Sequence, residues 1–187
     1  MVLKIAVTGN IASGKSQVEK FLAECGYPVY DSDEIAHEVL GTIKEFYGCD
    51  VFSGGKIDRK KLGALVFSDP ELRKQLENIT HPKIKSKITE LFEKHKHDKF
   101  IFVSVPLLYE SGFDKLFDKV LFISVDKDLQ LQRLILRNNY SEEEALKRIN
   151  SQMCQEEKLE KADYVITNNS TLNELSNKVK EFLASIC

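Results

Sequence analysis

The sequence predicts an α/β fold in which five parallel strands form one sheet with helices on both faces. Short apolar runs rich in β-branched residues alternate along the chain with helical patterns, which is typical of a parallel sheet. A length of 187 residues fits one such domain with one modest inserted subdomain. The expected strands are Leu3–Thr8, Pro28–Tyr30, Phe100–Val105, Val120–Val125 and Tyr164–Thr167.

Side chains that can accept hydrogen bonds from free backbone N–H groups mark several helix starts. Pro70 after Asp69 and Pro82 after His81 suit the first position of a helix, because no N–H is needed there. We therefore expect helices to begin at these two prolines and after two capping boxes. The pairs with capping-box spacing are Ser141 with Glu144 and Thr171 with Glu174.

Two segments are predicted to interrupt the sheet core of this single domain. Residues 35–97 have a mostly helical pattern, with turn chemistry at Ser53-Gly54-Gly55, and would suit a substrate subdomain. Residues 129–161 carry basic side chains on helical segments, which fits either a mobile cationic lid or an ordinary solvated helix face. The core then comprises about 1–34, 98–128 and 162–187, and the basic residues of the second segment are Arg133, Arg137, Arg148 and Lys158.

Charge and hydropathy exclude several classes of partner. Lys and Arg (27) nearly balance Asp and Glu (29), so a net charge of -2 gives no reason to expect nucleic acid or an anionic membrane. The apolar run in MVLKIAVTG is short and leads into a glycine loop, so we interpret it as a core strand rather than a signal peptide. No stretch of about 20 apolar residues could span a membrane. We expect a cytoplasmic protein that is a monomer or a small homo-oligomer.

The four cysteines, Cys25, Cys49, Cys154 and Cys187, are far apart in the sequence. They form no C-x-x-C pair, so their spacing fits neither a zinc site nor a disulfide framework. We expect buried or inert free thiols.

A phosphate-binding motif follows the first predicted strand. It matches G-x-x-x-x-G-K-[ST] and opens an amphipathic helix, which is the setting that the motif requires. Its backbone amides and the helix N-terminus can hold phosphate oxygens, Lys15 can reach the β and γ phosphates of ATP, and the Ser16 hydroxyl can ligate Mg²⁺. The predicted ATP-binding residues are Gly9, Asn10, Ile11, Ala12, Ser13, Gly14, Lys15 and Ser16.

Two acidic residues follow the second predicted strand. Tyr30-Asp31-Ser32-Asp33 ends that strand, and in an open α/β sheet the carboxyl ends of the strands face the ligand crevice. Either Asp31 or Asp33 could simply cap the helix that follows. Beside a phosphate loop, a carboxylate can also accept the proton of an attacking hydroxyl and help to order the water shell of a metal.

The segment after the third strand does not fit a GTPase switch. It contains no D-x-x-G, and the chain has no N-K-x-D element for reading guanine. The strand runs instead into an apolar segment that could pack against flat or aliphatic parts of a substrate, or could be plain core. That segment is Val103-Ser104-Val105-Pro106-Leu107-Leu108-Tyr109-Glu110.

Taken together, these segments resemble the dephospho-coenzyme A kinase family over nearly the whole chain. The resemblance implies Mg²⁺-dependent transfer of the ATP γ-phosphate to the ribose 3′-hydroxyl of dephospho-CoA, the last step of coenzyme A synthesis. It also implies the phosphate-loop kinase fold, with strand order 2-3-1-4-5. The matching motifs are the phosphate loop, Tyr30-Asp31-Ser32-Asp33, Gly55-x-Ile57-Asp58-Arg59, Thr80-His81-Pro82, Pro106-Leu107-Leu108-Tyr109-Glu110, Gln130-x-x-Arg133-x-x-x-Arg137, Ser151-Gln152 and Ala162-Asp163-Tyr164-Val165-Ile166-x-Asn168.

The same resemblance implies roles for individual residues. Asp33 takes the position of the general base, Arg137 is the lid arginine over the transferring phosphoryl group, and Lys15 completes the catalytic set. Asn168 joins the phosphate loop on the ATP side. His81 belongs to the acceptor side, although it could instead be only a helix cap. The implied substrate-binding residues are Asp31, His81, Pro82, Pro106, Leu107 and Tyr109.

The chain departs from the family pattern at four positions. Asn10 and Ala12 stand where glycines are frequent, but both required glycines of the loop remain, so phosphate binding should survive. Ser104 stands where an acidic residue is often found, and Asn138 stands where Asp is common. Whether a third-strand carboxylate helps to hold Mg²⁺ is therefore left open.

Two other functions remain alternatives at this point. One is another small-molecule kinase of the same fold, because a phosphate loop does not name the acceptor. The other is a regulatory protein that senses ATP and binds a partner protein through its helical insert, which would require a large exposed apolar patch. A screen of acceptors would separate the first alternative from a kinase of dephospho-CoA, and ATP binding without transfer to any acceptor would favour the second.

Overall fold

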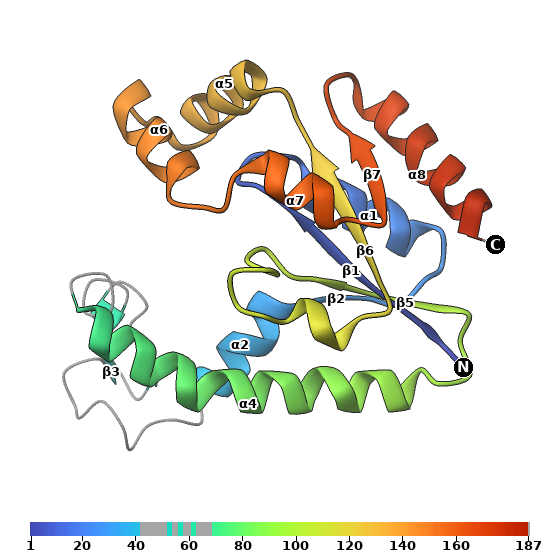
Figure 1. Ribbon diagram of the computed structural model, residues 1–187, viewed down its shortest axis with the longest axis horizontal. Coiled ribbons are helices and arrows are strands. Elements are labelled where there is room, and N and C mark those ends of the chain that lie inside the picture. Colours follow the sequence, from blue (N-terminus) through green and yellow to red (C-terminus); the bar gives the residue numbers. More distant parts are fainter. Residues whose placement is uncertain (42–51, 54–55, 58–60, 63–68, 187) are drawn as a thin grey trace. The chain divides into compact units, whose positions relative to one another are not determined.

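Figure 1 shows the computed structural model of the protein. It describes residues 1–41, 52–53, 56–57, 61–62 and 69–186. The chain divides into two compact units. Unit 1 comprises Met1–Tyr30 and His95–Cys187, and unit 2 comprises Asp31–Lys94.

A five-stranded parallel sheet forms the centre of unit 1. Its strands are runs of apolar and β-branched residues, as expected for a sheet covered on both faces. Their order is β2-β5-β1-β6-β7, which is the predicted order 2-3-1-4-5 when only these strands are counted. The predicted fold is therefore confirmed. The strands are β1 (Leu3–Gly9), β2 (Val29–Asp31), β5 (Phe100–Ser104), β6 (Lys119–Ser124) and β7 (Tyr164–Thr167).

The register of the sheet brings three strand ends to one edge. Val7 of β1 pairs with Ser104 on one side and with Leu121 on the other. Gly9, the last residue of β1, pairs with Ile123. The residues that follow β1 and β5 therefore leave the sheet at the same edge, where parallel folds bind their ligands.

Helices α1 (Lys15–Glu24) and α8 (Leu172–Ile186) share one hydrophobic core with the sheet. They pack against each other, and α8 also runs beside β7 (Figure 1). Val18 and Leu22 of α1 are fully buried, as is Val179 of α8. Burying each such side chain stabilises the fold by about 1.5–3 kcal/mol. This packing fixes α1, and with it the end of the loop that leads into the helix, against the sheet.

Along the chain, three short helices follow β6 and precede β7 (Figure 1): α5 (Lys127–Asn138), α6 (Glu142–Asn150) and α7 (Gln155–Lys161). The capping box predicted at Ser141 and Glu144 is present in full, with each residue's backbone N–H bonded to the other's side chain. The amide of Glu174 donates to Thr171 Oγ1 at 3.4 Å at the start of α8. Both predicted helix starts are therefore confirmed.

The described residues of unit 2 include two helices and a short pair of strands. Helix α2 (Ser32–Gly41) lies against the long helix α4 (Pro70–Lys94) (Figure 1). Strands β3 (Phe52–Ser53) and β4 (Lys56–Ile57) are antiparallel. Glycines 54 and 55 of the predicted turn lie outside the described residues.

One of the two proline predictions is confirmed and the other is wrong. Pro70 is the first residue of α4, and Asp69 Oδ1 accepts from the amides of Glu71 and Leu72 at 2.9 and 3.1 Å. Pro82 lies inside α4, so no helix begins there. The helix continues because burial of Ile88 and neighbouring apolar residues in its second half offsets the missing N–H.

Two further sequence expectations concern exposure. No helix among the described residues is long and apolar enough to cross a membrane. Cys25 and Cys154 are free, as expected, and both are exposed, so of the two alternatives, buried or inert, the buried one does not apply to them. Cys49 and Cys187 lie outside the described residues.

Candidate active site

The phosphate loop of unit 1 connects β1 to α1 through two left-handed residues. Ala12 has a φ of 62° and Gly14 a φ of 88°. The left-handed conformation costs a residue other than glycine about 1–2 kcal/mol, so Ala12 is strained and Gly14 is not. Gly14 is also the N-cap of α1 and provides no side-chain cap, which leaves the start of the helix open to an anion.

Both required glycines of the loop have close neighbours. A Cβ at Gly9 would lie 2.6 Å from Ser13 Oγ and 2.8 Å from the carbonyl oxygen of Ile123. A Cβ at Gly14 would overlap the side-chain amide of Asn168. The two positions thus exclude a side chain for steric reasons as well as conformational ones.

Side chains from the segment between β6 and β7 hold the outer part of the loop. Gln152 Oε1 accepts from the amide of Ile11 at 2.8 Å, and Gln130 Nε2 donates to the carbonyl of Ile11 at 2.8 Å. Asn10 Nδ2 donates to the carbonyl of Met153 at 3.0 Å. Backbone groups of one loop residue are therefore fixed by side chains more than 100 positions away, which preorganises the loop.

Asn168 follows β7 directly and hydrogen-bonds to the phosphate loop. Its Nδ2 donates to the carbonyl of Ser13 at 2.8 Å, and its own carbonyl accepts from Arg133 Nη1 at 2.9 Å. Asn10 Oδ1 and Ser13 Oγ are buried without a hydrogen-bond partner among the described residues. Asn168 is therefore part of the loop's support, and direct contact with ATP stays a prediction.

Lys15 lies in a cluster that links α1 to β5. Its Nζ is 2.7 Å from Glu19 Oε1 and also donates to Ser104 Oγ. The hydroxyl of Ser104 donates in turn to Glu19 Oε1 at 2.6 Å. The side chains of Lys15 and Glu19 are only 14% and 15% exposed, so this ion pair is largely sheltered from water. Glu19 was not predicted as a site residue.

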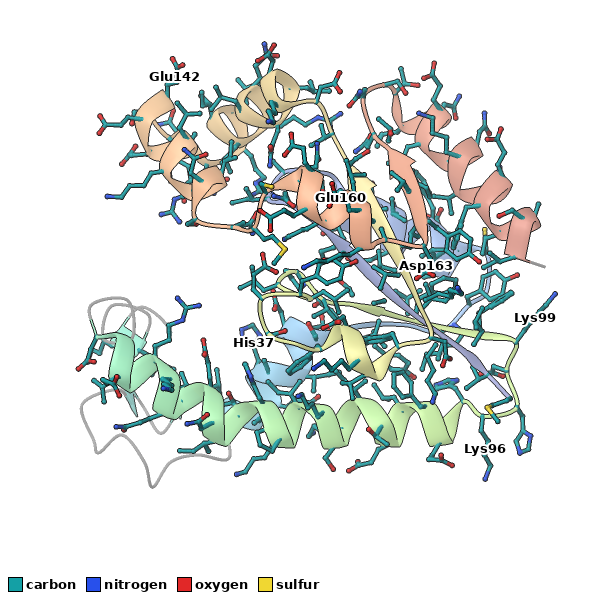
Figure 2. The ribbon with its side chains drawn as sticks, in the orientation of Figure 1. His37, Lys96, Lys99, Glu142, Glu160 and Asp163 are labelled. Atoms are coloured by element: carbon teal, nitrogen blue, oxygen red, sulfur yellow. The ribbon has the colours of Figure 1, made fainter. Side chains whose placement is uncertain are left out.

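Arg137 lies at the end of α5 and is exposed. Its Nε donates to Asn138 Oδ1 at 2.9 Å. Among the described residues Arg137 forms no ion pair with a carboxylate, so its positive charge can reach an anion. Figure 2 shows the side chains of this region, including the exposed Glu142 at the start of α6. A role for Arg137 on the transferring phosphoryl group stays a prediction.

The apolar segment after β5 is buried in part. Leu108 is fully buried and is core, whereas Leu107 is 39% exposed and could contact a substrate. The carbonyl of Pro106 accepts from Thr8 Oγ1 at 3.4 Å, which ties this segment to β1. Leu107 therefore fits the predicted substrate contact better than Leu108.

Tyr109 has a buried hydroxyl without a hydrogen-bond partner among the described residues. Burial raises the pKa of Tyr109 to about 12, with smaller contributions from the carboxylates of Asp114 and Asp163. Asp163 lies directly before β7 (Figure 2), and Lys161 Nζ lies 5.4 Å from the ring centroid of Tyr109. Tyr109 thus packs against the end of α7 as a neutral phenol, and its contact with substrate stays a prediction.

Lys158 does not belong to a solvated helix face. It is 0% exposed, and its Nζ lies 2.8 Å from Glu110 Oε1. The separation is that of an ion pair, although the atoms are not aligned as a hydrogen bond. Glu110 Oε1 also accepts from the amide of Met153 at 3.1 Å. A buried charge needs such a partner, so this pair fixes α7 to the segment after β5.

In unit 2, the two aspartates have different surroundings. Asp31 Oδ1 accepts from the amide of Asp33 at 2.9 Å, so Asp31 caps the start of α2. Asp33 lies in the first turn of α2 and is exposed. The capping alternative therefore holds for Asp31, and the carboxylate of Asp33 stays the candidate base.

His81 and Pro82 lie in the middle of α4, so the interpretation of His81 as a helix cap is wrong. Burial lowers the pKa of His81, with Glu77 raising it and Lys85 lowering it further. The imidazole is therefore neutral near pH 7. Gly55, Asp58 and Arg59 of the family's motifs lie outside the described residues.

Comparison with known proteins gives one family. The model of the dephospho-CoA kinase family matches residues 3–174. The chain is 45% identical to the dephospho-CoA kinase of Fusobacterium nucleatum, with 99% of each chain covered, and 36% identical to that of Lactobacillus johnsonii, with 100% of this chain and 99% of the relative covered.

Solved structures agree with this match. The dephospho-CoA kinase from Campylobacter jejuni has a TM-score of 0.78 at 36% identity, covering 100% of this chain and 98% of that chain. The shikimate kinase from Aquifex aeolicus, at 19% identity and a TM-score of 0.54 over 98% and 96% of the two chains, shares the fold alone. The chain belongs to the dephospho-CoA kinase family.

Proposed function

We propose that this chain transfers the γ-phosphoryl group of ATP to the ribose 3′-hydroxyl of dephospho-CoA, giving coenzyme A and ADP in the last step of coenzyme A biosynthesis. The observation that carries this proposal is a braced phosphate loop between β1 and α1, in a chain whose family match spans residues 3–174. The loop binds the phosphates of ATP through residues 9–16. Lys15 and the start of α1 place positive charge against those phosphates.

A magnesium ion fits the donors that surround Lys15. Ser16 is the second residue of α1, directly after Lys15, and the neighbouring side chains offer hydroxyl and carboxylate oxygens, the ligands that Mg²⁺ prefers. Among the described residues there is no group of three or more His, Cys, Asp or Glu side chains that could hold a metal ion. In this proposal Ser16 holds Mg²⁺, which neutralises charge on the β and γ phosphates when it is bound.

Asp33 is the proposed general base. It accepts the proton of the 3′-hydroxyl while that oxygen forms a bond to the γ-phosphorus, and the bond from that phosphorus to the β-phosphate oxygen breaks to release ADP. Arg137 neutralises the equatorial oxygens of the transferring group. Asp31 fixes the first turn of α2 by capping it, which orients Asp33.

Six residues are proposed to contact the acceptor. In unit 2 the proposed contacts are Asp31, His81 and Pro82, and in unit 1 they are Pro106, Leu107 and Tyr109. Residues 35–97 act as the substrate region and residues 129–161 as the lid. The proposal includes a cytoplasmic monomer or small homo-oligomer without a nucleic-acid or membrane partner.

An acceptor-dependence assay tests the proposed function. Purified protein is incubated with ATP and Mg²⁺, and ADP release is followed with dephospho-CoA, with shikimate and without an acceptor. Release that requires dephospho-CoA supports the proposal. Release with shikimate alone would overturn the substrate, and tight ATP binding without acceptor-dependent ADP would favour a nucleotide-sensing protein.

The base assignment predicts the behaviour of Asp33→Asn. Loss of a positioned base lowers turnover by about 100- to 10,000-fold, while ATP affinity measured by calorimetry stays at the wild-type value. Glu34→Gln is the matched control, because Glu34 is the exposed neighbour in the same turn of α2. Wild-type kcat in Asp33→Asn would remove Asp33 from the mechanism.

A further inference from the structure

Glu19 lies three residues beyond the end of the phosphate-loop motif, which gives no role to this position. On α1 it follows Lys15 by four residues and Ser16 by three, so all three side chains lie on one face of the helix. Its Oε1 accepts from both Lys15 and Ser104, and the side chain is only 15% exposed. Glu19 thus directs a sheltered carboxylate towards the edge of the sheet where the loop and β5 meet.

An ordinary helix pair looks different in the same helix. Lys20 and Glu24 have the same spacing as Lys15 and Glu19, but their side chains are 66% and 56% exposed and their charged atoms are 3.8 Å apart. Such a surface pair contributes little. The pair of Lys15 and Glu19 is shorter, is largely sheltered from water and has a third hydrogen-bonding partner, Ser104, from another element.

The end of β5 lacks the carboxylate that phosphate-loop enzymes use there. Such enzymes hold Mg²⁺ with the hydroxyl of the loop and an acidic residue on a neighbouring strand. Here β5 pairs with β1 and ends at Ser104, which is uncharged. The next acidic residue, Glu110, is already paired with the buried Lys158. The strand itself therefore supplies no free carboxylate to this edge.

We infer that Glu19 supplies this carboxylate from α1, and that Ser104 orients it by the hydrogen bond to Oε1. Lys15 balances the charge of Glu19 across a distance of 2.7 Å. When the phosphates of ATP also interact with the Lys15 ammonium, the negative charge of the sheltered Glu19 carboxylate is no longer fully balanced, so a cation near it is favoured. Glu19 then accepts hydrogen bonds from the water shell of Mg²⁺ beside the Ser16 hydroxyl. This inference rests on the proposed use of Mg-ATP but not on the identity of the acceptor.

Metal-dependent nucleotide binding tests the inference without any turnover. The affinity for a non-hydrolysable ATP analogue is measured by calorimetry with saturating Mg²⁺ and with a chelator, and the ratio of the two is the metal enhancement. Glu19→Gln is expected to lower this enhancement by about 10- to 100-fold, the usual cost of losing a partner in the outer shell of a metal. Its affinity without metal should equal or exceed that of the wild type, because Lys15 is released from its carboxylate.

Glu24→Gln is the control, since it removes an exposed carboxylate of the same helix, and its metal enhancement should be unchanged. If Glu19 serves only to balance Lys15, then Glu19→Gln will change the affinity without metal and leave the enhancement as in the wild type. That result would overturn the inference. Because no acceptor is present, failure here is distinct from failure of the proposed kinase reaction.

Moving the carboxylate provides a second test. Ser104 Oγ lies 2.6 Å from Glu19 Oε1, so an aspartate at position 104 brings its charge to the same place. The double variant Glu19→Gln with Ser104→Asp is therefore expected to regain most of the metal enhancement that Glu19→Gln loses. A folded double variant, checked by circular dichroism, that regains none of it would contradict the proposed place of the carboxylate.

Discussion

At position 14, both the backbone conformation and the contact with Asn168 require glycine. Its φ of 88° favours glycine, and a Cβ there would overlap the side chain of Asn168, which itself supports the loop through Ser13. Gly26 has nearly the same φ, 87°, but no atom within 4 Å of the place of a Cβ. A side chain at Gly26 would therefore meet only conformational strain, whereas a side chain at Gly14 would meet both strain and a steric clash.

Alanine substitutions at these glycines test that difference. Gly26→Ala should lower the free energy of unfolding by about 1 kcal/mol through φ alone and leave ATP affinity unchanged. Gly14→Ala should destabilise the protein further and weaken ATP binding by about tenfold or more, since a Cβ that overlaps Asn168 Nδ2 forces Asn168 to move and so disturbs the loop. Urea unfolding and calorimetry measure both effects. Equal losses of stability with unchanged ATP affinity would contradict the steric role of Asn168.

The lowered pKa of His81 predicts a dependence of stability on pH. Burial lowers this pKa below the ordinary value of 6.5, so the unfolded chain binds the proton at a higher pH than the folded chain. The stability is complete above the unfolded pKa and falls as the pH drops through 6.5 towards the lower folded value.

Urea unfolding at about pH 7.5 and about pH 5.5 measures this loss. The wild type should lose more stability than His81→Gln over this interval, and an NMR titration should place the His81 pKa below 6.5. Equal losses in the two proteins would show that the imidazole is not desolvated.

At the scale of elements, α4 holds an unfavourable residue. Pro82 removes the N–H that would bond to the carbonyl of Asn78, at a cost of about 3 kcal/mol in a helix interior. Burial of Ile84, Ile88 and Phe92 along the same helix, at 6%, 0% and 5% exposure, offsets that cost. A proline that is unfavourable for the helix, at a position proposed to contact the acceptor, is consistent with a substrate role for Pro82.

Pro82→Ala is therefore expected to stabilise the protein and to weaken acceptor binding. The restored hydrogen bond, less the greater freedom of the unfolded chain, should raise the free energy of unfolding by about 2 kcal/mol. The KM for dephospho-CoA should rise while the KM for ATP stays unchanged. Lys83→Ala, an exposed change in the same turn, is the control. A stabilised variant with an unchanged KM for dephospho-CoA would leave Pro82 without a substrate role.

The two prolines also show where sequence patterns stop being sufficient. Pro70 and Pro82 both follow a residue that can cap a helix, so local chemistry predicts a start at each. Only tertiary burial separates them, because the buried residues of α4 favour one continuous helix over two. By contrast, the strands of the sheet were predictable since their apolar runs carry the signal locally.

At the scale of the whole molecule, the phosphate loop is held by residues that are distant in sequence. Gln130, Gln152 and Asn168 each bond to the backbone of the loop, and Glu19 meets Ser104 across 85 positions. The motif itself was predictable because its spacing is local. Its supports were not, because they depend on which strands are neighbours and on where the segment between β6 and β7 returns to the sheet.

The product of the reaction is the most direct test of the central claim, that a family member with this loop phosphorylates the 3′-hydroxyl of dephospho-CoA. Wild-type protein is incubated with Mg-ATP and dephospho-CoA, and the products are followed by phosphorus NMR and mass. The account predicts one new 3′-phosphomonoester for each ADP released. Phosphate at another hydroxyl, or ADP and free phosphate without a phosphorylated acceptor, would contradict it.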